Sequence, residues 1–124
     1  MKKRFMLLFF FIMVVIVLAY MFPKEPEIGT FCLSDYQYYA ENFSSDEKLD
    51  NASDIKELME EVDMLWKKLY GESVKYKKPY RVFYDSQNDI WLIQASLKSN
   101  LMGGVSNILV QRSTGNVLAI WHTK

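Results

Sequence analysis

The chain has 124 residues, with 15 basic and 15 acidic side chains, so its formal net charge is zero, and half of its residues are hydrophobic. The size excludes a multidomain protein, the single cysteine excludes a disulfide scaffold, and the charge balance excludes a polybasic nucleic-acid-binding protein. These averages hide two unlike parts, because all 18 residues of 5–22 are hydrophobic, whereas 23–124 contain 12 basic and 15 acidic residues. We therefore expect one small domain behind one hydrophobic segment.

The first predicted element is a helix over the hydrophobic run 5–22. Eighteen residues in a helix rise about 27 Å, close to the roughly 30 Å hydrocarbon core of a bilayer. Lys2, Lys3 and Arg4 precede the run, so the positive-inside rule keeps the N-terminus cytoplasmic and places the C-terminal domain outside the cytoplasm. We expect residues 1–22 to be an uncleaved signal anchor with a transmembrane helix, giving a single-pass membrane protein. The alternative is a cleaved signal and a secreted domain, although no Ala-x-Ala-like triplet ends the run.

The start of the exported part is predicted to be a linker at 23–33, because this stretch contains two prolines and a glycine. The extracytoplasmic domain is then expected to comprise residues 34–124. Its first element is a short helix at 35–43, where Tyr36, Tyr39, Ala40 and Phe43 recur on one helical face.

The longest helix of the domain is predicted from about residue 52 to Gly71. Apolar residues form one stripe along it, and charged residues form the opposite face. Asn51 or Ser53 is the expected N-cap, and Gly71 is expected to end the helix with a positive φ. The charged face is either a solvated surface or an acidic partner-binding strip. The residues of this acidic strip are Glu57, Glu60, Glu61 and Asp63.

Beyond Gly71 the hydrophobic period changes from helical to strand-like. A turn at 86–89, a loop with Gly103 and Gly104, and a tight hairpin turn with Gly115 at positive φ are expected between the strands. The predicted strands are 80–85, 90–97, 105–112 and 117–122. Helices followed by hairpin-linked strands indicate an α+β fold, with one long helix packed on an antiparallel sheet.

Residues that carry chemistry are few. His122 is the only histidine and Cys32 the only cysteine, and no metal-ligand spacing occurs. Glu60 and Glu61 are adjacent on a helix and point in different directions, so they do not form an acid–base pair. The basic residues within 75–81 form a poor nucleic-acid site in a domain with more acidic than basic residues. We expect no catalysis, no cofactor, no metal and no nucleic-acid partner.

Five short motifs occur in a distinctive order over residues 50–124. They are Tyr70-Gly71, Lys78-Pro79-Tyr80, Trp91-Leu92-Ile93, Gly103-Gly104-Val105 and Gly115-Asn116-Val117-Leu118. Their order and spacing resemble the NTF2-fold immunity proteins of bacterial polymorphic toxin systems. The resemblance implies an NTF2-like domain that binds and neutralises a cognate toxin without catalysis. It also implies that certain motif residues determine the fold, namely Gly71, Pro79, Tyr80, Trp91, Gly103, Gly104 and Gly115.

Two functions from different classes follow. The first is a membrane-anchored immunity protein that occludes a toxin, using the acidic strip or a concave sheet face near Trp91 and Trp121. The second is a PepSY-like or other extracytoplasmic sensor or regulatory binding module. A neighbouring toxin reading frame would favour the first. An enzyme with an NTF2-like cavity ranks third and would need ionisable groups converging there. No pattern in the sequence defines an oligomeric state.

Overall fold

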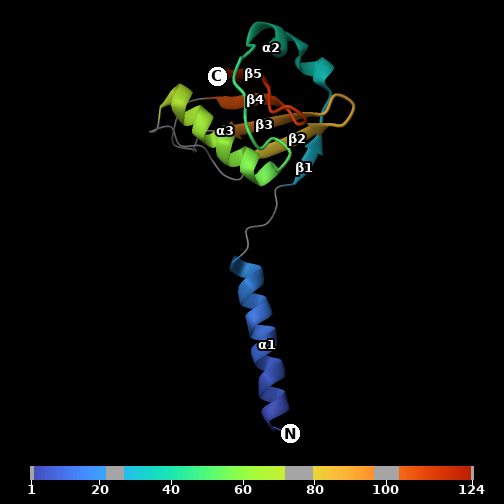
Figure 1. The fold of residues 1–124 in the computed structure, drawn as a ribbon, viewed down its shortest axis with the longest axis vertical. Helices are drawn as coiled ribbons and strands as arrows, with labels where there is room; N and C mark the ends of the chain where they lie inside the picture. Colours follow the sequence, from blue (N-terminus) through green and yellow to red (C-terminus); the bar gives the residue numbers. More distant parts are fainter. Residues whose placement is uncertain (1, 22–26, 72–79, 97–103, 124) are drawn as a thin grey trace.

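The computed structural model describes residues 2–21, 27–71, 80–96 and 104–123. An N-terminal helix, α1, spans Lys2–Met21. The domain that follows contains a five-stranded sheet whose strand order in space is the same as their order in the chain (Figure 1). The strands are β1 (Ile28–Thr30), β2 (Arg81–Asp85), β3 (Ile90–Ser96), β4 (Val105–Gln111) and β5 (Val117–His122). Its helical elements are the 3₁₀ helix η1 (Leu33–Tyr36) and the α-helices α2 (Gln37–Asn42) and α3 (Ile55–Tyr70).

Helix α1 contains most of the hydrophobic run of the sequence. Its large apolar side chains between residues 5 and 18 are 40–77% exposed. A transmembrane helix was expected at 5–22, and Phe22 lies outside the described residues. Within the described ranges, no helix combines the length and the apolar character that a membrane crossing requires.

The antiparallel part of the sheet agrees with the strands that the sequence predicts, to within one residue at each end. Strands β2, β3, β4 and β5 pair as successive antiparallel neighbours, which confirms the α+β class. Between Leu109 and Val110 the register of β4 against β5 shifts, and this irregularity places Leu118 and Ala119 on the same side of the sheet.

Strand β1 was not predicted, because it lies within residues 23–33, which the sequence indicated to be a linker. It pairs in parallel with β2, with Ile28 opposite Val82 and Gly29 opposite Phe83. A Cβ atom at Gly29 would lie 2.7 Å from Cδ1 of Phe83, so the glycine permits this close pairing. Residues 28–30 therefore belong to the sheet, and the glycine that suggested a spacer is a packing residue.

Helix α3 covers one face of the sheet. Its N-cap is Asp54, whose side chain accepts a hydrogen bond from the Lys56 amide at 3.0 Å, so the prediction of Asn51 or Ser53 was wrong. Gly71 ends the helix at a φ of 99°, which confirms the predicted positive φ. The buried side chains of α3 pack on alternate residues of β2, β3 and β4. From the helix these are Leu58, Val62, Leu65 and Trp66, and from the sheet Val82, Trp91, Ile93, Ile108 and Val110.

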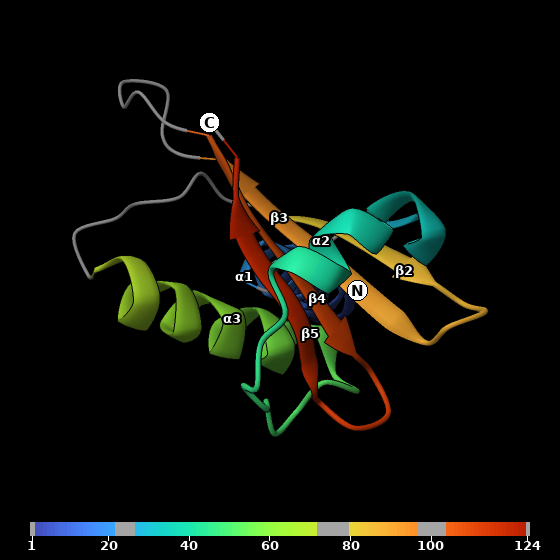
Figure 2. The same cartoon turned by 90° about the horizontal axis from the view of Figure 1, so that it is seen from above.

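The opposite face of the sheet is covered by η1 and α2, so the sheet lies between two helical layers (Figure 2). Trp121, Leu92 and Leu109 are buried there against Tyr36 and Tyr39. The prediction of a single helix on the sheet was therefore incomplete. Strands β3 and β4 are buried on both faces, which explains why each contains a continuous apolar run instead of strict alternation.

The segment 43–49 closes the outer edge of β5. The Ile120 amide donates to the Phe43 carbonyl at 3.1 Å, and the Leu49 amide donates to the Gly115 carbonyl at 2.8 Å. Gly115 has a φ of 77°, as predicted, and a Cβ atom there would lie 1.9 Å from the Leu49 carbonyl oxygen. Glycine is thus required both by the turn and by the approach of this segment.

The remaining motif residues divide between buried positions and positions outside the described ranges. Tyr80, Trp91 and Gly104 are buried, which agrees with roles in the fold. Pro79 and Gly103 lie outside the described residues.

Candidate functional site

The acidic strip of α3 is not one uniform surface. Glu57 and Glu60 are exposed, as a partner-binding strip requires. Glu61 is half-buried and accepts hydrogen bonds from the Asp50 and Asn51 amides, both at 3.2 Å, and from the Asn51 side chain at 3.0 Å. Glu61 therefore fastens the loop before α3 to the helix.

Asp63 also has partners within the domain. Its carboxylate accepts a hydrogen bond from the Tyr80 hydroxyl and lies 2.9 Å from the Lys67 ammonium group. Because the Tyr80 contact links α3 to the start of β2, Asp63 has a structural role. Of the four acidic residues predicted to bind a partner, two are thus occupied by the fold and two face solvent.

The two tryptophans expected on one concave sheet face lie on opposite faces. Trp121 is 3% exposed and stacks on Tyr39 with ring centroids 4.5 Å apart, under the α2 layer. Trp91 faces α3, and its indole N–H donates to the Ala52 carbonyl at 2.8 Å. The expectation of a shared contact surface was wrong, because β3 and β5 present these residues with opposite side-chain orientation. Both rings are core residues.

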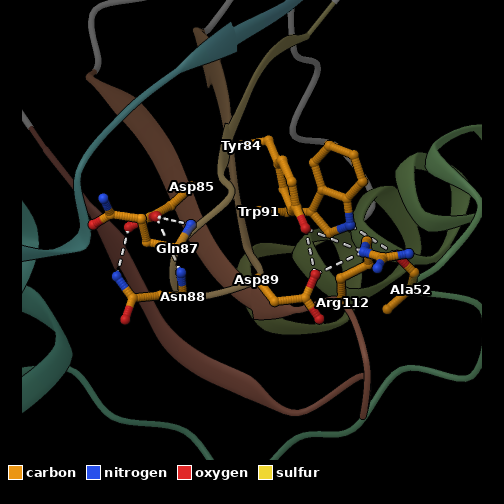
Figure 3. Close-up of polar contacts among 8 residues, drawn as sticks. All are labelled: Ala52, Tyr84, Asp85, Gln87, Asn88, Asp89, Trp91 and Arg112. Atoms are coloured by element: carbon orange, nitrogen blue, oxygen red, sulfur yellow. Dashed lines mark hydrogen bonds and ion pairs between the residues drawn. The ribbon is translucent and has the colours of Figure 1, made fainter.

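A network of carboxylates occupies the β2–β3 turn (Figure 3). Asp85 is 3% exposed, and its carboxylate accepts hydrogen bonds from the Leu33 amide and the Asn88 side chain, both at 2.8 Å. The amides of Gln87 and Asn88 donate to the other oxygen at 3.0 and 3.1 Å. The Asn88 side chain, and then the Leu33 amide, hold the pKa of Asp85 below its ordinary value, against the opposing effect of burial. Asp85 thus ties the turn to the start of η1.

Asp89 lies at the other end of the same turn, with a positive φ of 57°. Its carboxylate accepts from the Tyr84 hydroxyl and from Nε of Arg112, the latter at 2.7 Å. The Tyr84 hydroxyl, followed by Arg112, lowers the pKa of Asp89, and the bond to Asp89 raises the pKa of Arg112. This network links the β2–β3 turn to the end of β4. Its groups are engaged with one another, so its role is to hold the two hairpins together.

The residues with potential catalytic or metal-binding chemistry lie in separate elements. His122 is exposed at the end of β5, with its ring 5.8 Å from that of Tyr70, and Cys32 is exposed before η1. Across the ranges that the structure describes, no three His, Cys, Asp or Glu side chains gather in a way that could hold a metal ion.

An exposed aromatic pair on α2 is a surface feature that the sequence pattern did not predict. Phe43 was predicted to share one helical face with Tyr36 and Tyr39, but it is 43% exposed, and Tyr38 is 64% exposed. Their rings meet edge to face with centroids 6.4 Å apart. We call Tyr38 and Phe43 the α2 patch. Phe43 terminates α2 as its C-cap, so the helical periodicity that grouped it with Tyr36 and Tyr39 does not extend to it.

Comparison with protein families identifies the family of the chain. A family model described as NTF2 fold immunity protein matches residues 60–124, just over half of the chain. The chain therefore belongs to the NTF2 fold immunity protein family, and the resemblance carried by the five motifs is confirmed. The matched segment contains most of α3 and strands β2 to β5, whereas β1, η1 and α2 lie outside it. Searches of curated proteins and of solved structures gave no significant match.

Proposed function

We propose that this protein binds a cognate toxin and neutralises it by occlusion, without catalysis. Membership of the immunity protein family over residues 60–124 is the observation that carries the proposal. The same match favours immunity over a PepSY-like sensor. A non-catalytic mechanism is supported by the carboxylates of the β2–β3 turn. Asp85 and Asp89 accept hydrogen bonds from other elements of the fold and so serve its structure.

A co-expression experiment tests neutralisation. The full chain is expressed together with the product of the reading frame beside its gene, directed to the compartment where that product is toxic. We expect wild type to restore growth and the two proteins to co-purify. The control is Val62→Asp, which places a carboxylate at a position that is 0% exposed and should unfold the domain. Failure of wild type to protect or co-purify would refute immunity toward that product.

The mode of neutralisation is tested on the purified complex. Under occlusion, the toxin recovered from the complex after denaturation and refolding regains its activity and has an unchanged mass. A recovered toxin that stays inactive and carries a new mass would instead indicate that the immunity protein modifies it, and would refute the non-catalytic mechanism.

The proposed location is the outer side of a membrane, with residues 5–22 as the anchor and the N-terminus in the cytoplasm. The proposal is supported by the 18 uncharged residues of this run, by Lys2, Lys3 and Arg4 before it, and by the exposure of the apolar side chains of α1. An exposed apolar surface of this kind needs a lipid or protein cover.

Two measurements test the location. We expect the chain to stay in the membrane pellet after carbonate extraction and an alkaline phosphatase fused after residue 124 to be active. A soluble chain would refute the anchor, and a stable but inactive fusion would reverse the orientation. The mass of the extracted protein decides whether the segment is retained or cleaved.

A further inference from the structure

The two rings of the α2 patch pack on other aromatic side chains. Tyr38 contacts Tyr39 edge to face at 5.4 Å, and Tyr39 is stacked on the buried Trp121 with an interplanar angle of 11°. Phe43 contacts Tyr39 at 6.1 Å. Two exposed rings are therefore held in place by the half-buried Tyr39, which itself rests on the core residue Trp121. Fixed aromatic side chains lose little conformational entropy on binding and are frequent anchors of protein interfaces.

The charge around this patch is strongly one-sided. Residues 31–49, which contain η1, α2 and the segment after Phe43, have four acidic side chains and one basic one. Asp35 and Glu41 lie three residues before and after Tyr38, and both are exposed. Asp46 is also exposed in the segment after Phe43. A partner that covers the rings must therefore meet an acidic rim, which favours a basic surface on that partner.

The outer face of α3 differs in both respects. Its exposed acidic residues Glu57 and Glu60 lie between exposed basic residues, so the local charge is mixed. The basic residues are Lys56, Lys67 and Lys68. Its large exposed apolar side chains are Met64 at the middle, at 70% exposure, and Leu69 and Tyr70 at the C-terminal end, at 46% and 37%. Met64 is not aromatic, and the ring of Tyr70 contacts that of the exposed His122. Charge complementarity and anchoring both favour the α2 side.

The position of the α2 patch relative to the family pattern also favours the α2 side as the docking surface. The pattern covers 60–124, which contain strands β2 to β5 and most of α3, whereas β1, η1 and α2 lie outside it. A pattern shared by many proteins encodes what they have in common, which here is the scaffold. Discrimination between partners requires residues that differ between proteins with the same scaffold.

From these observations we infer that the toxin docks on the α2 side of the sheet, through a basic surface that covers Tyr38 and Phe43 and faces Asp35 and Glu41. This inference rests on the proposed immunity function and adds the surface and the chemical character of the partner. The aromatic pair supplies the buried contact, and the acidic rim steers association.

The test uses the full chain and, as its probe, the product of the reading frame beside its gene. Two variants change the α2 side, Tyr38→Ala and Glu41→Lys. Two matched variants change the outer face of α3, Met64→Ala and Glu60→Lys. All four side chains are exposed, so each variant is expected to keep the wild-type melting temperature.

We expect Tyr38→Ala to weaken the affinity by about 10- to 30-fold, as loss of an interface anchor does. Glu41→Lys should slow association several-fold, and added salt should reduce this effect because it screens the charges. The two α3 variants should stay within about twofold of wild type. A photo-crosslinking residue at position 38 should capture the toxin, whereas one at position 64 should not.

Each other outcome overturns a different statement. If wild type neither protects cells nor binds, the immunity function toward this product is refuted, and the docking surface with it. If wild type protects and the α3 variants weaken binding while the α2 variants do not, the function stands and the surface is wrong. Wild-type affinity in both α2 variants would refute the surface even if the α3 variants were also unaffected.

Discussion

Helix α3 covers one face of the sheet with 16 residues, a capped start and a buried apolar stripe, whereas the other face is covered by η1 and α2, which have four and six residues. Neither η1 nor α2 has a side-chain cap. On the α2 side the fold relies instead on aromatic stacking against Trp121 and on the hydrogen bond from the Leu33 amide to Asp85. The two faces therefore differ in what stabilises them, and we expect the α3 face to dominate the stability of the domain.

The largest expected effect is at Trp66, the bulky residue at the centre of the α3 face, which is 0% exposed. Trp66→Ala should lower the free energy of unfolding by about 3–5 kcal/mol, because truncation leaves a cavity against the sheet. Urea unfolding of the full chain in mild detergent, followed by circular dichroism, measures the loss. Met64→Ala on the same helix is the control and should change stability by less than about 0.5 kcal/mol. Similar losses in both variants would show that α3 does not pack as described.

The corresponding position on the α2 face is Tyr39, which is half-buried. Tyr39→Ala should cost about 2 kcal/mol, since it removes partly buried area and the stacking on Trp121. The same unfolding experiment measures it, with the neighbouring exposed Tyr38→Ala as control, expected to be nearly neutral in stability. A loss at Tyr39 as large as that at Trp66 would contradict the ranking of the two faces.

The same two faces differ in how far the sequence predicts them. The α3 face follows from local rules: the apolar stripe, the Gly71 stop and the hairpin turn at Gly115 each depend on residues close in sequence, and the structure has all of them. The α2 face depends on contacts between distant segments, such as Tyr39 with Trp121. Helical or strand periodicity contains no information about such pairings.

The site illustrates the same limit. The sequence shows which of the acidic residues lie on α3, but not that Glu61 and Asp63 have donors in the loop before the helix and at Tyr80. Trp121 was expected at a binding surface, but η1 and α2 bury it, and the sequence did not predict that the short helix at 35–43 packs on this face of the sheet. To predict that Tyr38 is exposed, one must know which face of α2 packs on the sheet.

The hydrogen bond that joins the start of η1 to the β2–β3 turn is tested at its acceptor, Asp85. Asp85→Asn should cost about 1–2 kcal/mol at neutral pH, because the hydrogen bonds from Leu33 and Asn88 lose their charged acceptor. The pKa of this carboxyl is lower in the folded state than its ordinary value of 3.8. The unfolded chain therefore binds the proton more readily between the two values. The stabilisation is present above the unfolded pKa and is lost as the pH falls through the folded one.

Unfolding midpoints of wild type and Asp85→Asn, measured from neutral pH to about pH 2.5, check both statements; this range brackets the ordinary carboxyl pKa. The difference between the two proteins should be largest near neutrality and should shrink in acid. Asp46→Asn, at an exposed carboxylate, is the matched control and should differ little from wild type at any pH. If the midpoints of wild type and Asp85→Asn differ by the same amount down to the lowest pH, the charge of Asp85 does not account for the stability of its hydrogen bonds to Leu33 and Asn88.

The smallest effect is expected at the start of α3, where the helix cap distinguishes this element from α2. Asp54→Ala should lower the free energy of unfolding by about 1 kcal/mol, because the amide of Lys56 loses the acceptor that it has at 3.0 Å. Ser53→Ala is the control, since this residue is exposed and was one of the two caps expected from the sequence, with Asn51. The measurement is again urea unfolding of the two variants beside wild type. A larger loss at Ser53 than at Asp54 would move the helix start by one residue and change which side chains α3 directs toward the sheet. A loss at Asp54 alone would show that α3 has an anchored end that α2 lacks, which is the local reason for its larger share of the stability.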